Sequence, residues 1–312
     1  MKLSQDTWNK LQSHPYIKVA VQPNHPHISS VNFTKKAFWG KNWDEMTLKA
    51  RGLFINTETL DIVARSYQKF FNIGERPETQ MEALKSSLKF PLRGFQKENG
   101  FLGIIGWDNQ TNSLFMSSKS ASHSEFSGWF RTIFDAQGSA YRRIVEGVCK
   151  NQDSSIVYEV IDPVNDPHII EYSEPKLVAL DIISNSEDLQ VTTAAKKQLG
   201  VWYSWKEFED FLGSPTMFYG YESLGKIEGV VFQDANEFQF KGKSAYYSYW
   251  KAMRGLKDQM LRSRSKTQSR AREQHWQLKS PEANKFYEWC LEQPDKVLEK
   301  NIIEVRKIYE SV

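Results

Sequence analysis

Signals for β-strands fill the chain up to about residue 245 and then stop, and this division constrains the fold more than any other feature. Short apolar segments bounded by turn residues recur before that point, a pattern typical of antiparallel strands. The sequence beyond it reads as amphipathic helices. We therefore expect an α+β fold, with an antiparallel-sheet domain over 1–245 and a small all-α domain over 246–312.

Two regions carry the clearest hairpin pattern, 48–68 and 93–118. The first has a polar turn at Asn56–Glu58, and the second has turns at Gly100 and at DNQTN. Amphipathic spacing predicts a helix over 124–149 that Gly138 interrupts. We further expect strands over 154–162, 175–184, 228–234 and from 238, where strand signals fade at about Ser244, and helices over 189–199 and 205–212.

The C-terminal region also concentrates positive charge. Eight basic residues and one acid fall between Lys251 and Arg272, a net charge of +7, whereas the whole chain carries +3. This asymmetry indicates an anionic polymer docked near the C-terminal region, and a solvated helix face with a basic linker is the alternative. The candidate contacts are Arg262, Arg264, Lys266 and Arg270.

The composition excludes several classes of protein. The chain has 312 residues, 13% of them aromatic, so it can bury a large core and is not a disordered protein. No segment approaches the roughly 18 uncharged apolar residues of a membrane helix. The first residues, MKLSQDTWNKLQ, lack the apolar segment of a secretory signal. Two distant cysteines, Cys149 and Cys290, indicate free thiols, so we expect an intracellular protein, cytoplasmic or nuclear, without a membrane partner.

One lysine stands in the sequence Lys97-Glu98-Asn99-Gly100, although a lysine at a strand end is ordinarily solvated. The motifs that follow change this interpretation, because they add charged residues at the ends of apolar strands. They are YEVID with Glu159, EGVVF with Glu228, and FKGK with Lys241 and Lys243. Buried carboxylates near several lysines can bind a divalent cation or orient a lysine, whereas either glutamate alone would be an ordinary salt-bridge partner.

This ordered set resembles the covalent nucleotidyltransferases, and more narrowly the phage-type RNA ligase 1 family, which includes the adenylyltransferase domain of fungal and plant tRNA ligases. Two further segments support that branch, KARG to ARSYQKFFN over 49–72 and YEVIDPVNDPHIIEY over 158–172. The resemblance covers residues 30–250 and implies a nucleotidyltransferase domain of ATP-grasp-like architecture. Asn99 stands where many relatives carry Asp, and Asn is found in the tRNA-ligase branch.

By this resemblance Lys97 is the nucleophile that attacks the α-phosphorus of ATP and forms a lysyl-AMP. A lysine amine attacks only when it is neutral, and its pKa falls when it is desolvated or lies beside other cations. We therefore expect Lys241 and Lys243 to lower the pKa of Lys97 and to balance phosphate charge. The resemblance also implies that Arg51, Lys69 and Lys119 contact the ATP phosphates and that Phe71 packs nearby, while Tyr247 makes an aromatic contact or packs in the core. Glu159 would contact the sugar and a metal ion, and Glu228 would bind the metal ion. At Gly100 and Gly229 the backbone would approach the nucleotide closely.

The function that the resemblance implies is an ATP-dependent RNA ligase that joins a 5′-phosphate end to a 3′-hydroxyl end, in RNA or tRNA repair or splicing. Its cofactors are then ATP and Mg²⁺ or Mn²⁺, and its partner is RNA, with broken tRNA as one candidate. We expect a monomer whose helical tail docks RNA and whose end-healing enzymes are separate proteins. Two alternatives stay open: an inactive RNA-binding protein of ligase ancestry, and a capping-type guanylyltransferase, which the helical tail disfavours because that class carries a C-terminal β-barrel.

Overall fold

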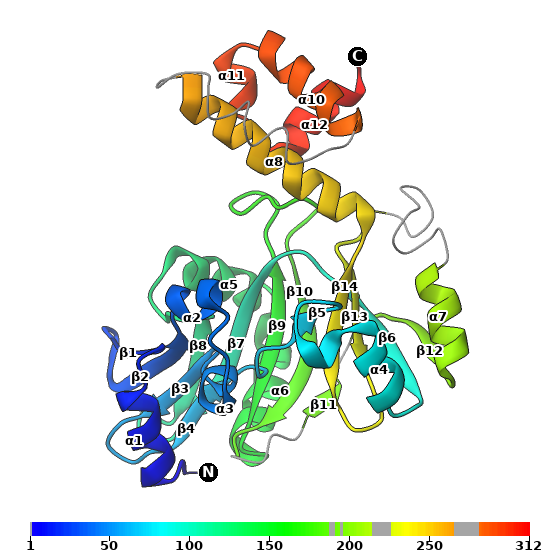
Figure 1. The fold of residues 1–312 in the computed structure, drawn as a ribbon. Helices are drawn as coiled ribbons and strands as arrows, with labels where there is room; N and C mark the ends of the chain where they lie inside the picture. The colour runs from blue at the N-terminus through cyan, green and yellow to red at the C-terminus, as the bar shows by residue number, and fades with distance from the viewer. Residues whose placement is uncertain (1, 187–190, 194–195, 214–225, 265–280) are drawn as a thin grey trace.

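The computed structural model describes residues 2–186, 191–193, 196–213, 226–264 and 281–312. Three β-sheets form the body of the molecule, and helices of the C-terminal region lie across one end of it (Figure 1). The fold is therefore mixed α+β, as the sequence predicts. Within the described residues, no helix is both long enough and apolar enough to cross a membrane.

The first sheet comes from the N-terminal residues and is antiparallel, in the order β1-β2-β3-β4. Alternate residues of a strand share a face, so Val31, Leu53 and Ile55 fall in one core cluster with the helix residue Leu11. The predicted hairpin over 48–68 is confirmed as β3 and β4. The elements are α1 Gln5–Ser13, β1 Ile17–Gln22, β2 His25–Phe33, α2 Lys35–Gly40, α3 Glu45–Lys49, β3 Leu53–Asn56 and β4 Ile62–Arg65.

The second sheet has the order β11-β10-β9-β7-β8 and is also antiparallel. Two helices, α5 and α6, pack against it through a core that includes Phe130 and Cys149. The predicted break between them is confirmed: α6 begins at Gly138, whose φ of 85° is one that glycine adopts without strain. The elements are β7 Phe101–Asp108, β8 Ser113–Ser118, α5 Glu125–Asp135, α6 Gly138–Asn151, β9 Ser154–Ile161, β10 Lys176–Ser184 and β11 Val191–Thr193.

The third sheet has the order β12-β6-β13-β14-β5, and its strands are antiparallel except for the pair β14 and β5. Its core is aromatic, with Phe208 of α7 packed against Phe232 and Phe240 of the sheet. The elements are β5 Phe71–Asn72, the 3-10 helix η1 Pro77–Thr79, α4 Met81–Ser87, β6 Leu92–Lys97, β12 Gln198–Trp202, α7 Trp205–Gly213, β13 Gly229–Gln233 and β14 Gln239–Lys243.

Two of the predictions are wrong. The first two strands of 93–118 do not form a hairpin, because β6 joins the third sheet and β7 joins the second. The corner between them contains Glu98 and Asn99, which are buried rather than exposed turn residues. The described part of 189–199 is not a helix but β11 and the start of β12. Both strands lie at sheet edges and are short, with three and five residues, so an alternating apolar pattern is weak in each.

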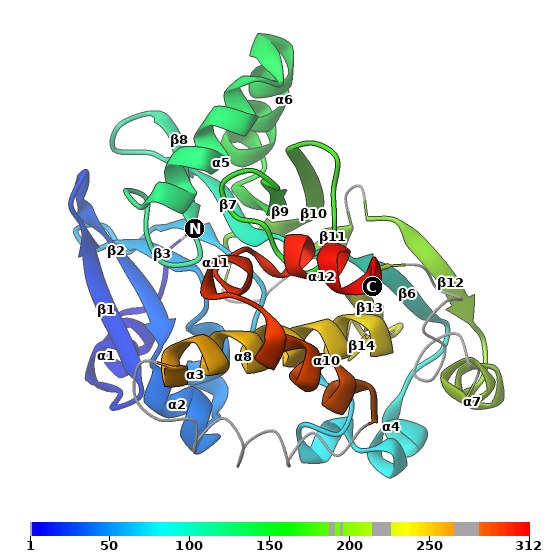
Figure 2. The same cartoon turned by 90° about the horizontal axis from the view of Figure 1, so that it is seen from above.

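The described elements beyond Ser244 are all helices, and they share a hydrophobic cluster that includes Trp250 and Phe286 (Figures 1 and 2). The same cluster takes in Ile169 and Ile170, from the loop between β9 and β10. The change from strand to helix thus falls at the predicted boundary, and a separate all-α domain stays a prediction. The helices are α8 Ala245–Arg264, α10 Pro281–Glu292, α11 Asp295–Leu298 and α12 Ile302–Glu310.

Candidate active site

The strand register brings the predicted lysines onto one face of the third sheet. Lys97, the last residue of β6, lies opposite Gly229 of β13, which lies opposite Lys243 of β14. Residues directly opposite each other in an antiparallel pair point to the same face, so the two lysines face each other across a residue without a side chain. Two residues along, Lys241 lies opposite Val231 and points the same way. Three lysines therefore share one face.

Glu228 pairs with two of these lysines. Its Oε2 lies 3.0 Å from the Nζ of Lys97, and its Oε1 lies 3.1 Å from the Nζ of Lys243. Burial alone would raise the pKa of this carboxyl, but the two ammonium groups hold it below its ordinary value. Glu228 is therefore a buried carboxylate that orients both lysines.

These residues line a cavity of about 290 Å³, which we call the Lys97 cavity. Glu159 of β9 enters it from the second sheet and accepts a hydrogen bond from the N–H of Gly100 at 2.8 Å. One part of the lining is apolar and suits a flat ring such as a nucleobase, and the other part is charged and suits phosphates. The charged lining includes Arg51, Lys97, Glu159, Glu228, Lys241 and Lys243, and the apolar lining includes Phe70, Phe95, Leu102, Leu180 and Val231.

Asn99 has a role that the sequence did not reveal. Its Nδ2 donates to Glu228 Oε2 at 2.9 Å, while its Oδ1 accepts from the N–H groups of Ile169 and Ile170 at 3.1 and 3.0 Å. An aspartate here could accept the two N–H groups but could not donate to Glu228. The amide therefore suits this site, and the Asn in place of Asp was the only signal of it in the sequence.

The loop between β9 and β10 connects the site to the C-terminal helices. Arg306 of α12 is 1% exposed, and its Nη1 donates to the carbonyl of Ile169 at 2.9 Å. In the same loop, the hydroxyl of Tyr172 accepts from the N–H of Asn99 at 2.9 Å and donates to Glu98 at 2.8 Å. The helices thus support the corner that carries Lys97.

The electrostatics of Lys97 differ from our expectation that neighbouring lysines lower its pKa. Burial acts in that direction, but Glu159 and Glu228 outweigh it and hold the pKa of Lys97 above its usual value. Without nucleotide, Lys97 is therefore an ammonium paired with a carboxylate. It must give up its proton and this partner before it can attack.

Lys241 has the lowered pKa instead. Burial, and then the charges of Lys69 and Lys97, lower the pKa of Lys241 to about 7. The pKa of Lys243 is also lowered, chiefly by burial, and its Nζ lies 4.4 Å from the centre of the Tyr247 ring. Because cations crowd together here, this side of the cavity attracts an anion.

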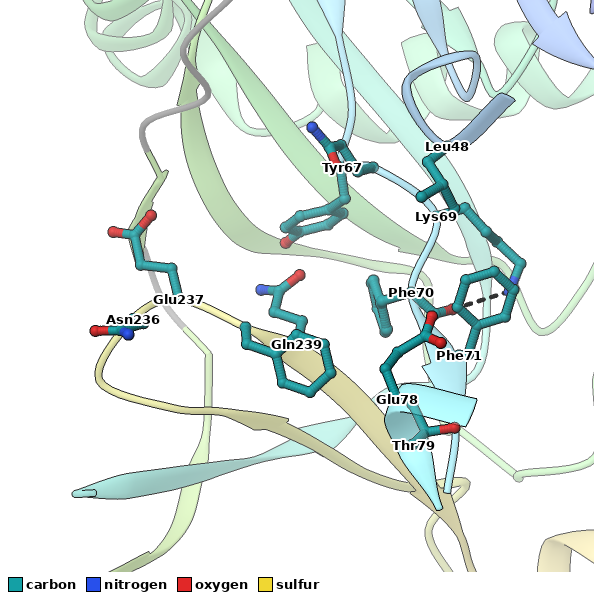
Figure 3. A pocket seen from close by; sticks show the side chains of 12 residues that line it. Leu48, Tyr67, Lys69, Phe70, Phe71, Glu78, Thr79, Asn236, Glu237 and Gln239 are labelled. Atoms are coloured by element: carbon teal, nitrogen blue, oxygen red, sulfur yellow. Dashed lines mark hydrogen bonds between the residues drawn. The ribbon is translucent and has the colours of Figure 1, made fainter. Parts of the chain in front are cut away.

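Lys69 and Phe71 line an adjacent cavity of about 340 Å³, the Lys69 cavity (Figure 3). The Nζ of Lys69 donates to the carbonyl of Phe70 at 2.9 Å and lies 3.8 Å from the centre of the Phe71 ring. Lys241 donates to the same carbonyl at 3.4 Å, and Phe70 lines both cavities. Burial lowers the pKa of Lys69 to about 8. The structure thus places Lys69 and Phe71 beside the Lys97 cavity rather than in its lining.

Arg51 lines the Lys97 cavity, whereas Lys119 lines a third cavity of about 410 Å³, the Lys119 cavity. Arg51 donates from Nη1 to the Oγ of Ser66 at 3.1 Å. The Nζ of Lys119 lies 4.3 Å from the centre of the Phe33 ring. Burial, and then the charge of Arg51, lower the pKa of Lys119 to about 8, so the two side chains interact although they line different cavities.

Gly100 and Gly229 are required by the packing of the sheets. A Cβ atom at Gly100 would meet the carbonyl oxygen of Val160 at 2.0 Å, and one at Gly229 would meet the carbonyl oxygen of Gly242 at 2.1 Å. Both distances are far below van der Waals contact with backbone atoms that cannot move away. These glycines are therefore explained by the fold without a bound nucleotide.

The carboxylates of the Lys97 cavity suit a hydrated divalent cation. Among the described residues, no three His, Cys, Asp or Glu side chains form a cluster that could enclose a metal ion. Glu159 and Glu228 nevertheless line one cavity from two different sheets. Mg²⁺ is commonly held by one or two carboxylates together with water and phosphate oxygens, so this donor set fits such an ion.

The basic residues of the C-terminal helices occupy different environments. Arg262 is exposed, whereas Lys257 of the same helix is 5% exposed and donates to the carbonyls of Leu298 and Lys300 at 2.8 and 3.1 Å. Lys257 therefore joins helices and cannot contact a polyanion. Outside the described residues lie the side chain of Arg264 and the whole of Lys266 and Arg270.

Comparison with known families matches residues 49–247 to a model of the T4 type 1 family described as RNA ligase. The matched region is more than half of the chain and runs from just before Arg51 to Tyr247, so it contains every motif that forms the Lys97 cavity.

Two curated relatives are tRNA ligases. The protein of Candida albicans is 41% identical over 68 residues, 22% of this chain, and tRNA ligase 1 of Schizosaccharomyces pombe is 28% identical over 159 residues, 46% of this chain. The chain spans only 8% and 20% of the lengths of these two proteins. An archaeal ATP-dependent RNA ligase of known structure, 12% identical, matches 100% of this chain and 76% of its own with a TM-score of 0.53, which shows a shared fold. By its family match, the chain belongs to the RNA ligase family.

Proposed function

We propose that this chain is an ATP-dependent RNA ligase that joins a 5′-phosphate end to a 3′-hydroxyl end through a covalent lysyl-AMP. The observation that carries the proposal is the cluster at Lys97, where a lysine paired with Glu228 lies beside Lys241, whose pKa is about 7. The cluster combines a nucleophile with positive charge that a triphosphate would neutralise. Because it is intact, it supports an active enzyme over an inactive RNA-binding protein.

In the first step, the Nζ of Lys97 forms a bond to the α-phosphorus of ATP, and the bond from that phosphorus to the bridging oxygen breaks to release pyrophosphate. Lys97 must first lose a proton. Glu159 is suited to accept it, because burial raises the pKa of this carboxyl. Lys241 and Lys243 point to the same face as Lys97 and stabilise the phosphate charge that develops in the reaction.

A divalent cation belongs to this proposal, with Glu228 as its protein ligand while Glu159 holds the proton, and with both carboxylates as ligands when Glu159 is ionised. When bound, Mg²⁺ or Mn²⁺ supplies positive charge that balances the phosphates and competes with Lys97 for Glu228. Loss of the ion pair with Glu228 would lower the pKa of Lys97, since that carboxylate helps to raise it.

In the later steps, AMP passes from Lys97 to the 5′-phosphate of RNA, and the 3′-hydroxyl attacks that phosphate and releases AMP. The tRNA ligase names of the relatives support RNA repair or splicing, with broken tRNA as one substrate. We further propose that the chain acts as a monomer, that its helical tail docks RNA, and that other proteins heal the ends. Exposed Arg262 is the described residue that supports a docking role for the tail.

Incubation with ATP or GTP labelled at the α-phosphate, with Mg²⁺, tests the proposal. A protein band that is labelled by ATP and survives a denaturing gel would establish lysyl-AMP formation, and labelling by GTP alone would indicate a guanylyltransferase. Adding RNA with 5′-phosphate and 3′-hydroxyl ends should discharge the label and give a longer RNA. A chain that takes no label from either nucleotide would contradict the proposal.

A further inference from the structure

Aromatic rings extend from the surface at α2 to the Lys69 cavity. Trp39 is 78% exposed and Phe38 is 41% exposed, and their ring centres are 5.1 Å apart. Trp43 follows at 6.3 Å from Phe38, and it contacts Phe71 at 5.3 Å. The row thus begins on exposed rings and ends at a residue that lines the Lys69 cavity.

Lysines lie beside the Trp43 end of this row, where the Nζ of Lys69 is 5.6 Å from the centre of the Trp43 ring. The Lys119 cavity, of about 410 Å³, is lined by Lys18, Lys35 and Lys119 together with Ser and Thr hydroxyls, and no carboxylate is among its described lining residues. Phe33 lines this cavity too, with its ring centre 5.0 Å from that of Trp43. We call this set of lysines, with Phe33, Phe38, Trp39 and Trp43, the aromatic–lysine surface.

The sequence around this surface is free of acids over a long stretch. Between Asp6 and Asp44 there is no Asp or Glu, whereas Lys10, Lys18, Lys35, Lys36 and Lys41 all fall in that interval. The carboxylate of Asp44 is engaged by His14 at 2.9 Å. Lys10 pairs with Asp6 at 2.6 Å, and the other four lysines of the interval leave an excess of positive charge next to exposed aromatic rings.

The surface is continuous with the proposed reaction site. The charge of Arg51 in the Lys97 cavity acts on Lys119, and Lys69 lies 5.6 Å from the Trp43 ring. Helix α8 extends over the side of the molecule where α2 and α3 lie (Figures 1 and 2). A polymer bound along the row of rings would end at the Lys69 cavity, which shares Phe70 with the Lys97 cavity.

We propose that the aromatic–lysine surface binds the single-stranded RNA segment next to the reacting end. Unpaired bases stack on Phe38 and Trp39, and the phosphates between them contact Lys18 and Lys35. Stacking platforms combined with lysines are what sequence-tolerant binding of single strands requires, and a duplex, whose bases are already stacked, would gain nothing from the rings. The inference rests on the proposed function and adds to it the form of RNA that this end of the molecule takes. Nearly all of this surface precedes residue 49, where the family match begins.

The test is binding of a fluorescent, single-stranded 5′-phosphorylated RNA without ATP, measured at several salt concentrations. Trp39→Ala should weaken binding about 10-fold without changing the salt dependence, because a stacking contact carries no charge. The double variant Lys18→Gln, Lys35→Gln should reduce the slope of log affinity against log salt by about 1.4, since each phosphate contact on a single strand contributes about 0.7. A duplex of the same sequence should be insensitive to Trp39→Ala.

Matched controls lie away from the surface. Tyr203→Ala removes another aromatic residue, 71% exposed, and Arg143→Gln with Lys150→Gln removes two exposed basic residues from α6. Neither control should change RNA affinity by more than about twofold. Unchanged RNA affinity in Trp39→Ala would overturn the inference. So would a finding that the wild-type chain self-associates and that Trp39→Ala abolishes this self-association while RNA binding is kept, because the exposed rings would then be an interface between two copies of the chain. Labelling of the wild-type chain by ATP, measured in parallel, separates these results from failure of the proposed function itself.

Discussion

The Lys97 cavity and the C-terminal helices both contain enclosed cations, but they neutralise them differently. In the helices, Lys257 pairs with Asp258 at 2.8 Å and Arg306 pairs with Glu171 at 3.5 Å, and both also donate to backbone carbonyls at 2.8 to 3.1 Å. In the cavity, burial and neighbouring cations lower the pKa of Lys241 to about 7. The comparison indicates that Lys257 and Arg306 are structural, whereas Lys241 is placed for an anion that the protein does not provide.

The largest expected effect is a difference in the rate of lysyl-AMP formation between variants of the Lys97 cavity and a variant of the adjacent helix α8. Lys241→Ala and Lys243→Ala should each slow lysyl-AMP formation by about 100-fold or more, because they remove charge stabilisation from the reacting phosphates. Lys251→Ala is the matched control, since Lys251 is exposed on α8 and its charge already acts on Lys243. It should change the rate by less than about threefold. Equal losses in all three variants, in single-turnover labelling with ATP, would indicate a general charge effect instead of a site.

Replacing Lys257, a structural cation, should instead change the stability of the protein. Lys257→Met should lower the free energy of unfolding by about 2–3 kcal/mol, because two buried carbonyls lose their donor. Arg262→Met, on the exposed side of the same helix, should change it by less than about 0.5 kcal/mol. Thermal unfolding followed by tryptophan fluorescence measures both, and similar midpoints for the two variants would contradict a structural role for Lys257.

The lowered pKa of Lys241 predicts how ATP affinity depends on pH. A bound triphosphate raises the pKa of Lys241, so binding takes up a proton once the pH exceeds the free value of about 7. Affinity should therefore be highest below pH 7 and fall as the pH rises above it, by up to about tenfold per pH unit. Lys241→Gln should flatten this dependence. Calorimetry in buffers of different ionisation enthalpy measures the uptake, and its absence at pH 8 would refute the assignment.

The smallest expected effect concerns the basic tail. Replacing Arg262, Arg264, Lys266 and Arg270 together by Gln should weaken binding of long RNA and lower the salt slope, by up to about 0.7 for each phosphate that these side chains no longer neutralise. The loss should shrink with short oligonucleotides, which reach only the surface near the reaction site. Labelling by ATP serves as the control for the Lys97 cavity. An unchanged salt slope would show that these four residues do not contact RNA phosphates and that other surfaces bind the RNA.

The sequence predicted those parts of the site that depend on local motifs. Lys97, Glu228 and Lys243 each stand at the end of an apolar strand, and strand pairing brings them together in the register that such motifs require. The sequence motifs could not show which charged groups surround Lys97. Whether Lys97 faces lysines or carboxylates depends on how two sheets meet, and Glu159 reaches the cavity from the other sheet.

Interactions between distant segments also escaped prediction. Asn99 bonds to the backbone of Ile169, and Arg306 of the last helix supports the same loop. No periodicity in the sequence encodes such interactions, because each is made by one side chain at one corner of the chain. The exposure of Trp39 could not be predicted for a related reason. A single tryptophan in a short helix is compatible with a core position as well as with its observed exposure of 78%.

Locating the adduct decides whether Lys97 carries the AMP. The protein is incubated with ATP and Mg²⁺, digested, and mapped by mass spectrometry, with Lys97→Arg as a matched control that keeps the positive charge. We expect AMP on the peptide that contains Lys97 and no adduct in the variant. An adduct on Lys241, whose lower pKa makes it the more easily deprotonated amine, or one that persists in Lys97→Arg, would contradict this expectation.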